Sequence, residues 1–143
     1  MSAIQISVFL ENKSGRLAEV TQALAKSNVN IRALSLAETI DYGVLRLIVN
    51  RPQEASEALT SAGFIVTETD VVAAEMPDRP GALAALVEVL TRQRLNIEYC
   101  YAFVAKRGDN AVVIFRVDDA QAALSALEGG GAHVLSGAEL SGL

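Results

Sequence analysis

The sequence predicts an α+β fold made of two similar units in tandem, each an antiparallel sheet with helices on one face. Apolar residues alternate or recur at helical spacing in the order strand, helix, strand, strand, helix, strand, and the same order returns after about residue 70. A βαββαβ unit of this size is the split βαβ, or ferredoxin-like, arrangement. We therefore expect residues 1–70 to form the first unit and residues 71–143 the second, with strand order 4-1-3-2 in each sheet.

The first unit begins with a strand and a helix. In residues 4–10, isoleucine, valine and leucine alternate with Gln5, Ser7 and a phenylalanine, which predicts a half-buried strand. A turn at residues 11–15 follows. Leucine, valine and alanine then recur at helical spacing, so we expect an amphipathic helix at residues 15–27.

A hairpin and a second helix complete the first unit. Residues 29–37 and 42–50 have the composition of two strands around Thr39-Ile40-Asp41, which is typical of a hairpin. Pro52 suits the first position of a helix, and Gly63 suits the residue that ends it. Phe64 then starts the fourth strand.

The second unit repeats the first. With an offset of 66 residues, the matched positions are Gly15 with Gly81, Leu17 with Leu83, Ala18 with Ala84, Leu24 with Leu90, and Asn30-Ile31 with Asn96-Ile97. Residues 106–110 form a longer turn, after which the offset is 68. Val49 then matches Val117, Leu59 matches Leu127, and Gly63 matches Gly131. Residues 64–76 contain no Pro or Gly, so we expect no linker between the units.

The turn at residues 77–83 has the chemistry that best suits a ligand. Pro80 fixes φ near the value of a first helical turn, and Asp78 can cap the N–H groups of the helix that follows. Gly81 has no Cβ, so a small ligand can approach the backbone closely. The N–H groups and the positive end of the helix dipole suit a carboxylate. The alternative is that these residues form only a well-capped helix start.

These residues resemble the ACT domain, a small-molecule-binding regulatory module, and the chain is similar to stand-alone proteins made of two ACT domains in tandem. The resemblance rests on the βαββαβ order, on the Asp78-x-Pro80-Gly81 turn with Leu83 two residues on, and on the Asn96-Ile97 pair at the start of the second strand. It covers nearly all of residues 3–140. It implies that an amino acid binds at an interface between paired domains.

The resemblance also implies which residues contact the ligand. In the second unit they are Asp78, Arg79, Pro80, Gly81, Ala82, Leu83 and Asn96, and in the first they are Asn12, Ser14, Gly15, Arg16, Leu17 and Asn30. Asn12 stands where Asp78 does, and Ser14 replaces Pro80, although Ser14 can still cap the helix. The two sites can therefore differ in affinity, or only one is used. A second interpretation of Asn30 and Asn96 is that they end the preceding loop.

No set of residues forms an obvious active site. Cys100 is the single cysteine, which we interpret as a buried small apolar residue. The single histidine, His133, is expected on the opposite edge of the sheet, and alone it makes no metal site. Tyr99, Tyr101 and Phe103 share one strand face, as an apolar stripe or as a wall beside a ligand. We therefore expect no catalytic residue, no metal and no cofactor.

Composition limits the partners. The formal charge is −5, the isoelectric point is about 4.8, and no basic cluster is present, which argues against nucleic acid. No apolar run is long enough for a membrane span, and the first residues lack the features of a signal peptide. We therefore expect a cytoplasmic protein. Exposed edge strands favour a homodimer.

The first hypothesis is a non-catalytic regulatory protein that binds an amino acid. The alternative is a regulatory subunit that docks on a separate enzyme of amino-acid metabolism, similar to the small subunits of acetolactate synthase. An enzyme in its own right would need a nucleophile or an acid/base pair that the sequence does not provide.

Overall fold

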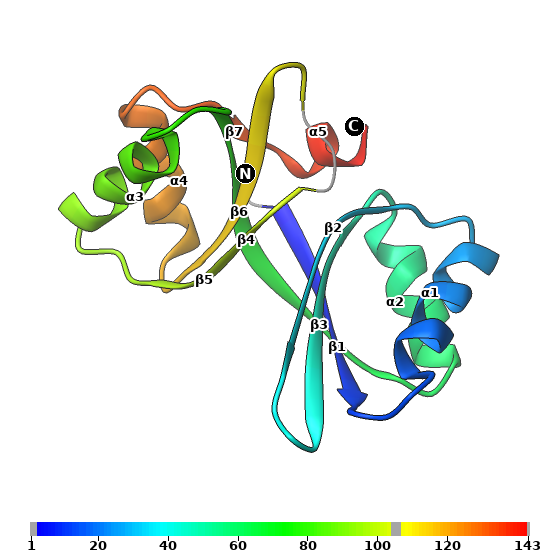
Figure 1. The fold of residues 1–143 in the computed structure, drawn as a ribbon. Helices are drawn as coiled ribbons and strands as arrows, with labels where there is room; N and C mark the ends of the chain where they lie inside the picture. Colours follow the sequence, from blue (N-terminus) through cyan, green and yellow to red (C-terminus); the bar gives the residue numbers. More distant parts are fainter. Residues whose placement is uncertain (1–2, 104–106, 143) are drawn as a thin grey trace. The chain divides into compact units, whose positions relative to one another are not determined.

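The chain divides into two compact units (Figure 1). The computed structural model describes residues 3–103 and 107–142; one unit is Ile4–Thr69, and the other is Asp70–Leu143 with Met1–Ala3. The elements are β1 (Ala3–Glu11), α1 (Arg16–Lys26), β2 (Ile31–Glu38), β3 (Tyr42–Val49), α2 (Pro52–Ser61), β4 (Ile65–Pro77), α3 (Ala82–Arg92), β5 (Ile97–Ala102), β6 (Asn110–Val117), α4 (Ala120–Gly129), β7 (Val134–Leu135) and α5 (Gly137–Ser141).

In the first unit the strands are ordered β4-β1-β3-β2, and β3 pairs antiparallel with both β1 and β2. This confirms the predicted order. Helices α1 and α2 cover one face, and their buried residues form a core with β1 and β3. The core residues are Ile6, Val8, Leu10, Val20, Leu24, Val29, Leu45, Leu47, Val49, Ala55 and Leu59.

The second unit repeats this arrangement, with the strand order β7-β4-β6-β5. Helices α3 and α4 cover one face of its sheet, and the core again joins both helices to the two central strands. Its core residues are Val72, Ala74, Leu86, Leu90, Val113, Phe115, Val117, Ala123 and Leu127. Strand β4 serves both units, because the boundary between Thr69 and Asp70 lies inside it.

The prediction that β1 is only half buried is wrong. Gln5 is completely buried and Ser7 is 8% exposed, whereas Phe9, the third residue of the same face, is 46% exposed. The Gln5 Nε2 donates to the Ser7 Oγ at 3.0 Å. Burying these polar groups is tolerated because this hydrogen bond replaces one that water would supply.

The ends of the second unit differ from the first in detail. The longer turn predicted at residues 106–110 lies partly outside the described residues, at Lys106. Its described part closes through Arg107 and Asn110, whose backbone groups form hydrogen bonds with each other at 2.9 and 3.0 Å.

Helix α5 is an element that the strand and helix order did not predict. Its Leu140 is 2% exposed, so the helix is anchored by an apolar contact.

Candidate functional site

The turns that precede α1 and α3 have the same backbone structure. Gly15 has φ 92° and ψ −14°, and Gly81 has φ 87° and ψ −12°, both in the left-handed region. A residue with a Cβ enters this region only at a cost, so the backbone requires the repeated glycine. The hydrogen bonds of the second turn, which recur 66 residues earlier, are Arg79 N–H to Pro77 O (3.0 Å), Ala82 N–H to Arg79 O (3.3 Å) and Ala85 N–H to Gly81 O (3.0 Å).

The predicted capping of these helices is wrong. Helix α3 begins at Ala82 with Gly81 as its N-cap, so Pro80 lies before the cap and outside the first helical turn. No side chain caps α3, so Asp78 does not have the expected role, and Ser14 likewise does not cap α1. A glycine already occupies each N-cap, where the capping side chain would have to stand. The Arg16 and Ala82 N–H groups donate to the turn carbonyls of Lys13 and Arg79, and no side chain accepts from the next N–H groups of either helix.

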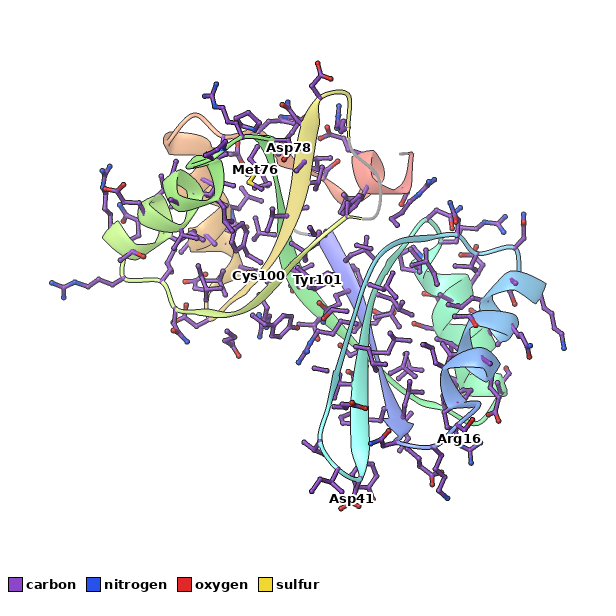
Figure 2. All side chains as sticks on the ribbon, viewed as in Figure 1. Arg16, Asp41, Met76, Asp78, Cys100 and Tyr101 are labelled. Atoms are coloured by element: carbon purple, nitrogen blue, oxygen red, sulfur yellow. The ribbon has the colours of Figure 1, made fainter. Side chains whose placement is uncertain are left out.

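Asn12 has a structural role at the end of the first sheet. Its Nδ2 donates to the Ile40 carbonyl at 3.1 Å, and its backbone N–H donates to the Asp41 carbonyl at 3.0 Å. Figure 2 shows Asp41 at the tip of the β2–β3 hairpin and Arg16 at the start of α1. Asn12 thus ties the turn before α1 to the hairpin tip.

Asn30 and Asn96 take equivalent positions one residue before β2 and β5. The Asn30 N–H donates to the Asn50 Oδ1 at 2.8 Å, and the Asn96 N–H donates to the Asp118 Oδ1 at 3.2 Å. Both asparagine side chains are exposed. These bonds fix the entry into each strand through the backbone and leave the role of the side chains open.

One unit by itself does not bring the predicted residues together. The register places Asn12 just beyond the Glu11–Tyr42 pair at one end of β3 and Asn30 just beyond the Ile31–Val49 pair at the other end. Seven residues of a strand span about 23 Å. The second unit has the same layout, so Asn96 also lies far from the turn that contains Gly81.

A hollow of about 530 Å³ lies beside the second turn, between the first two turns of α3 and the segment after α4. It is lined by four predicted residues, Arg79, Pro80, Gly81 and Ala82, and by apolar residues that include Met76, Ala85, Leu86 and Val89. The other predicted residues of this unit, Asp78, Leu83 and Asn96, are exposed and do not line it.

The first unit has a smaller hollow of about 310 Å³ in the same place. Each residue that lines it has a counterpart in the lining of the second hollow, either 66 or 68 residues later in the sequence. Arg16 stands where the second unit has Ala82, and Glu19 stands where it has Ala85. The longer side chains account for the smaller space.

The charges of the first hollow neutralise one another. The Lys13 Nζ lies 3.0 Å from the Glu11 Oε2, and the Arg16 guanidinium lies 3.0 Å from Glu19 and 3.5 Å from Glu11. The hydrogen bond and the charge of Lys13 hold the pKa of Glu11 below its usual value. The cations of this turn are therefore already paired with carboxylates of the same unit.

The second hollow retains a cation without such a partner. Pro77 and Ala85 stand where the first unit has its two carboxylates, and Arg79 stands where it has Lys13. Within residues 3–103 and 107–142, no side chain forms an ion pair or a hydrogen bond with Arg79. The hollow thus combines a guanidinium, the start of an uncapped helix and an apolar wall.

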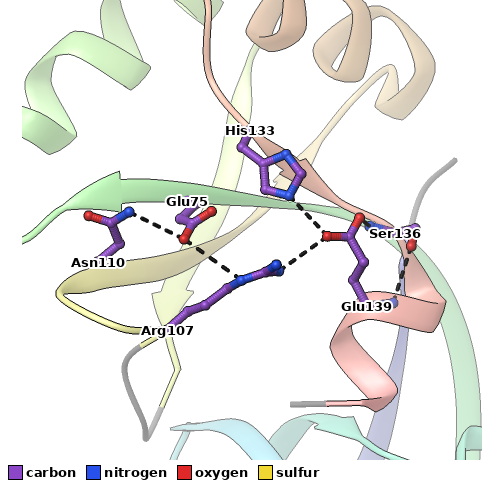
Figure 3. A network of polar contacts seen from close by, with 6 residues as sticks. All are labelled: Glu75, Arg107, Asn110, His133, Ser136 and Glu139. Carbon is purple, nitrogen blue, oxygen red and sulfur yellow. Dashed lines mark hydrogen bonds and ion pairs between the residues drawn. The ribbon is translucent and has the colours of Figure 1, made fainter.

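A polar network ties α5 to the sheet of the second unit (Figure 3). The Glu139 Oε2 accepts a hydrogen bond from the Arg107 Nη1 at 3.1 Å and lies 2.9 Å from the His133 Nε2. Ser136 and Glu139 form a capping box at the start of α5. The hydrogen bond with His133, followed by those from the Ser136 backbone and Arg107, lowers the pKa of Glu139 to about 2.

The same network reaches the border of the hollow. The Glu75 Oε1 accepts a hydrogen bond from the Asn110 Nδ2 at 3.2 Å and lies 3.8 Å from the Arg107 Nε. Glu75, Asn110 and His133 also line the hollow. Glu75, Asn110 and Glu139 were not among the residues predicted from the sequence. The Ser136-x-x-Glu139 spacing of a capping box was the available signal for the last of them.

The interpretation of Cys100 as a buried residue is wrong, because its side chain is exposed on β5 (Figure 2). Strand β5 lies at the edge of the second sheet, where alternate residues face solvent. The neighbouring Tyr99 and Tyr101 are partly buried, and their rings stack with centroids 6.5 Å apart. The predicted separation of Cys100 and His133 is confirmed, since β5 and β7 end opposite edges of the strand order.

The described residues offer neither a metal site nor a membrane span. No group of three or more His, Cys, Asp or Glu side chains there could hold a metal ion. None of the helices in this part of the chain has the length and apolar character that a membrane span requires.

A family model described as an ACT domain pair matches residues 1–128. The chain belongs to this family. Its two units are therefore ACT units, and β7 and α5 lie beyond the matched residues. Comparison with curated proteins gave no match.

Solved structures share the architecture of this chain over nine-tenths of its length or more. Protein BT0572 from Bacteroides thetaiotaomicron is 42% identical, with a TM-score of 0.93, and the match covers 100% of this chain and 98% of that one. The regulatory subunit of aspartate kinase from Thermus thermophilus is 22% identical, with a TM-score of 0.68, over 91% of this chain and 93% of that one. The corresponding subunit from Thermus flavus is 20% identical, with a TM-score of 0.63, and the match covers 92% of this chain and 94% of that one.

Proposed function

We propose that this protein is a non-catalytic regulator whose second ACT unit binds an amino acid in the hollow beside α3. The observation that carries the proposal is the Arg79 guanidinium, which lines the hollow without a partner among the described residues. A volume of about 530 Å³ is within the range of small-molecule sites.

Each part of an amino acid has a suitable surface in this hollow. The carboxylate would meet Arg79 and the uncapped N–H groups at the start of α3, where the helix dipole favours negative charge. The segment at Gly130 and Gly131, where α4 ends, presents carbonyl groups and the negative end of a helix dipole to the ammonium group. Met76 and Leu86 would contact the ligand side chain.

The first ACT unit is the weaker candidate for a ligand. Its hollow is smaller, and the cations at the turn are paired with Glu11 and Glu19. A ligand carboxylate would have to displace these ion pairs. We therefore propose that the second unit is the principal site.

The test is a thermal-shift panel of the twenty amino acids, followed by calorimetric titration of any that stabilise the protein. A ligand at about 100 times its Kd adds about 2.7 kcal/mol, which corresponds to about 5 to 10 °C. Arg79→Gln should weaken binding about tenfold, because it removes a charge-assisted hydrogen bond. Lys13→Gln, at the matching position of the first unit, is the control and should leave the affinity unchanged. Equal effects of the two substitutions would refute the assignment to the second unit.

We further propose that the ligand binds at an interface between two ACT units. The predicted site joins the turn of one unit to the start of the second strand of another, and Asn30 and Asn96 would then contact the ligand from that other unit. Asn96→Ala should weaken binding without unfolding the protein, since the side chain is exposed. Unchanged affinity would confine the site to the hollow.

A second candidate function is regulation of a separate enzyme by docking. The two Thermus proteins, which match over more than nine-tenths of their length, are regulatory subunits of aspartate kinase. A chain of this fold and size thus occurs as a regulatory subunit elsewhere. Affinity purification of the tagged protein from its own cells should then retain a larger enzyme of amino-acid metabolism, and its absence would favour a free-standing sensor.

A further inference from the structure

One face of α3 lines the hollow of the second unit over two helical turns. Ala82, Ala85, Leu86 and Val89 all border the hollow, and their spacing places them in one row along the helix. Seven residues of helix rise by about 10 Å. The hollow therefore runs from the start of α3, where the ligand carboxylate is proposed to bind, as far as Val89.

Val89 and Gly130 close the far end of this hollow. A Cβ added to Gly130 would lie 3.1 Å from the Val89 Cγ2, so the valine side chain packs directly against the glycine that follows α4. Both residues also line a separate hollow of about 590 Å³, which lies between α3 and α4 and is bordered by Arg92 and Ser125. The contact of Val89 with Gly130 is therefore the wall between the two hollows.

Two titratable residues of the lining, Glu75 and His133, direct their side chains away from the hollow. The neighbours of Glu75 in β4 pack in the core beneath α3 and α4, and successive side chains of a strand alternate between its faces. The Glu75 carboxylate lies beside Arg107, and the His133 Nε2 lies beside Glu139 of α5 (Figure 3). Among the described lining residues, Arg79 is thus the charge that remains for a ligand. A charged ligand side chain would be buried without a partner, which is costly.

We propose that the second unit selects an amino acid with an uncharged, apolar side chain, and that Val89 sets the longest side chain that fits. This inference rests on the proposed function of the hollow. The ligand side chain would lie along Ala85 and Leu86 toward Val89, and each methylene buried against this row strengthens binding about fourfold. The gain ends where the side chain reaches the contact of Val89 with Gly130.

Calorimetric titration with alanine, 2-aminobutyrate, norvaline and norleucine tests the selection of an apolar side chain. The dissociation constant should fall about fourfold with each added methylene until the wall is reached. Lysine, which carries an ammonium group on the four side-chain carbons of norleucine, should bind at least tenfold more weakly than norleucine. Affinity independent of chain length, or tighter binding of lysine, would overturn this inference and leave an amino-acid site in place. No binding of any member would refute the proposed function and this inference with it.

Val89→Ala tests the limit on length, because it removes the two methyl groups that contact Gly130 and opens one hollow into the other. Relative to alanine, the variant should bind 2-aminooctanoate at least tenfold more tightly than the parent does. Val87→Ala is the matched control, since it removes the same groups from a residue of α3 that packs against the core and does not line the hollow. An unchanged preference in Val89→Ala, or an equal shift in Val87→Ala, would show that Val89 does not set the limit.

Discussion

Gly15 and Gly81 set the direction in which each chain segment enters its helix. An added Cβ at either glycine would meet no atom within 4 Å, so space does not explain why glycine is present. The left-handed φ of both residues explains the glycine, because a residue with a Cβ adopts this conformation only at a cost. The shape of each turn, and with it the orientation of the first helical N–H groups, depends on a backbone preference.

Gly81→Ala should therefore destabilise the protein by about 1 kcal/mol, from backbone strain alone. Urea denaturation would measure the change in the free energy of unfolding. Gly129→Ala is the control, because this glycine also has open space around it but has no positive φ. A Gly81→Ala variant as stable as the parent would contradict the strain argument.

Glu139 makes the stability of the second unit depend on acid. Its pKa in the folded chain, about 2, is below the ordinary 4.5, so its contribution is present above pH 4.5 and is lost as the pH falls toward 2. Glu139→Gln removes this component. Between pH 4.5 and pH 2 the thermal midpoint of the variant should fall less than that of the parent. Parallel curves would show that the three contacts of this carboxylate do not affect folding.

At the scale of the elements, the two helix pairs are built alike but border different hollows. The turn and helix of the second unit leave space where Arg16 and Glu19 fill the first. The difference arises from two alanines, Ala82 and Ala85, on the first turn of α3. The size of each hollow thus depends on the length of the side chains at these two positions, because the backbone of the turn is the same in both units.

Ala85→Glu should close the second hollow, since it introduces the side chain found at the matching position of the first unit. Amino-acid binding should fall at least tenfold while the free energy of unfolding changes by less than about 0.5 kcal/mol, as for other exposed sites. Glu19→Ala is the matched control and should not reduce binding. Calorimetric titration of both variants would decide, and unchanged binding by Ala85→Glu would place the ligand elsewhere.

The element order and the repeat were predictable because they depend on periodicity, which is local in the sequence. Hairpin β2–β3 and the helix start at Pro52 are examples. The N-caps of α1 and α3 were predicted incorrectly, because proline, serine and aspartate near a helix start suggested capping, whereas a left-handed glycine had taken the position. Strand alternation could not reveal that Gln5 and Ser7 are buried, since burial of a polar pair depends on tertiary neighbours.

The candidate site was predictable only in part for the same reason. The turn residues Arg79 to Ala82 line the hollow, and their contact with a ligand stays a prediction. Gly130 and His133 border it from a segment some fifty residues away in the sequence, and no local pattern linked them to the turn. The pairing of a turn cation also depends on tertiary context, since Lys13 is paired with Glu11, whereas Pro77 stands at the matching position beside Arg79.

For the whole molecule, the inequality of the two ACT units predicts the binding stoichiometry. One amino acid should bind per chain with measurable affinity, because the first hollow is occupied by its own ion pairs. Calorimetric titration at saturating ligand gives the number directly. Two equivalent sites per chain would show that these ion pairs do not block the first turn.

The strand that serves both units has a consequence for synthesis. Domains usually fold in the order in which they leave the ribosome. Here the first unit completes its sheet only when β4 emerges, and the same strand carries the beginning of the next sheet. Translation thus delivers the last part of one unit and the first part of the other as a single segment, and no intervening stretch of chain marks where one ends.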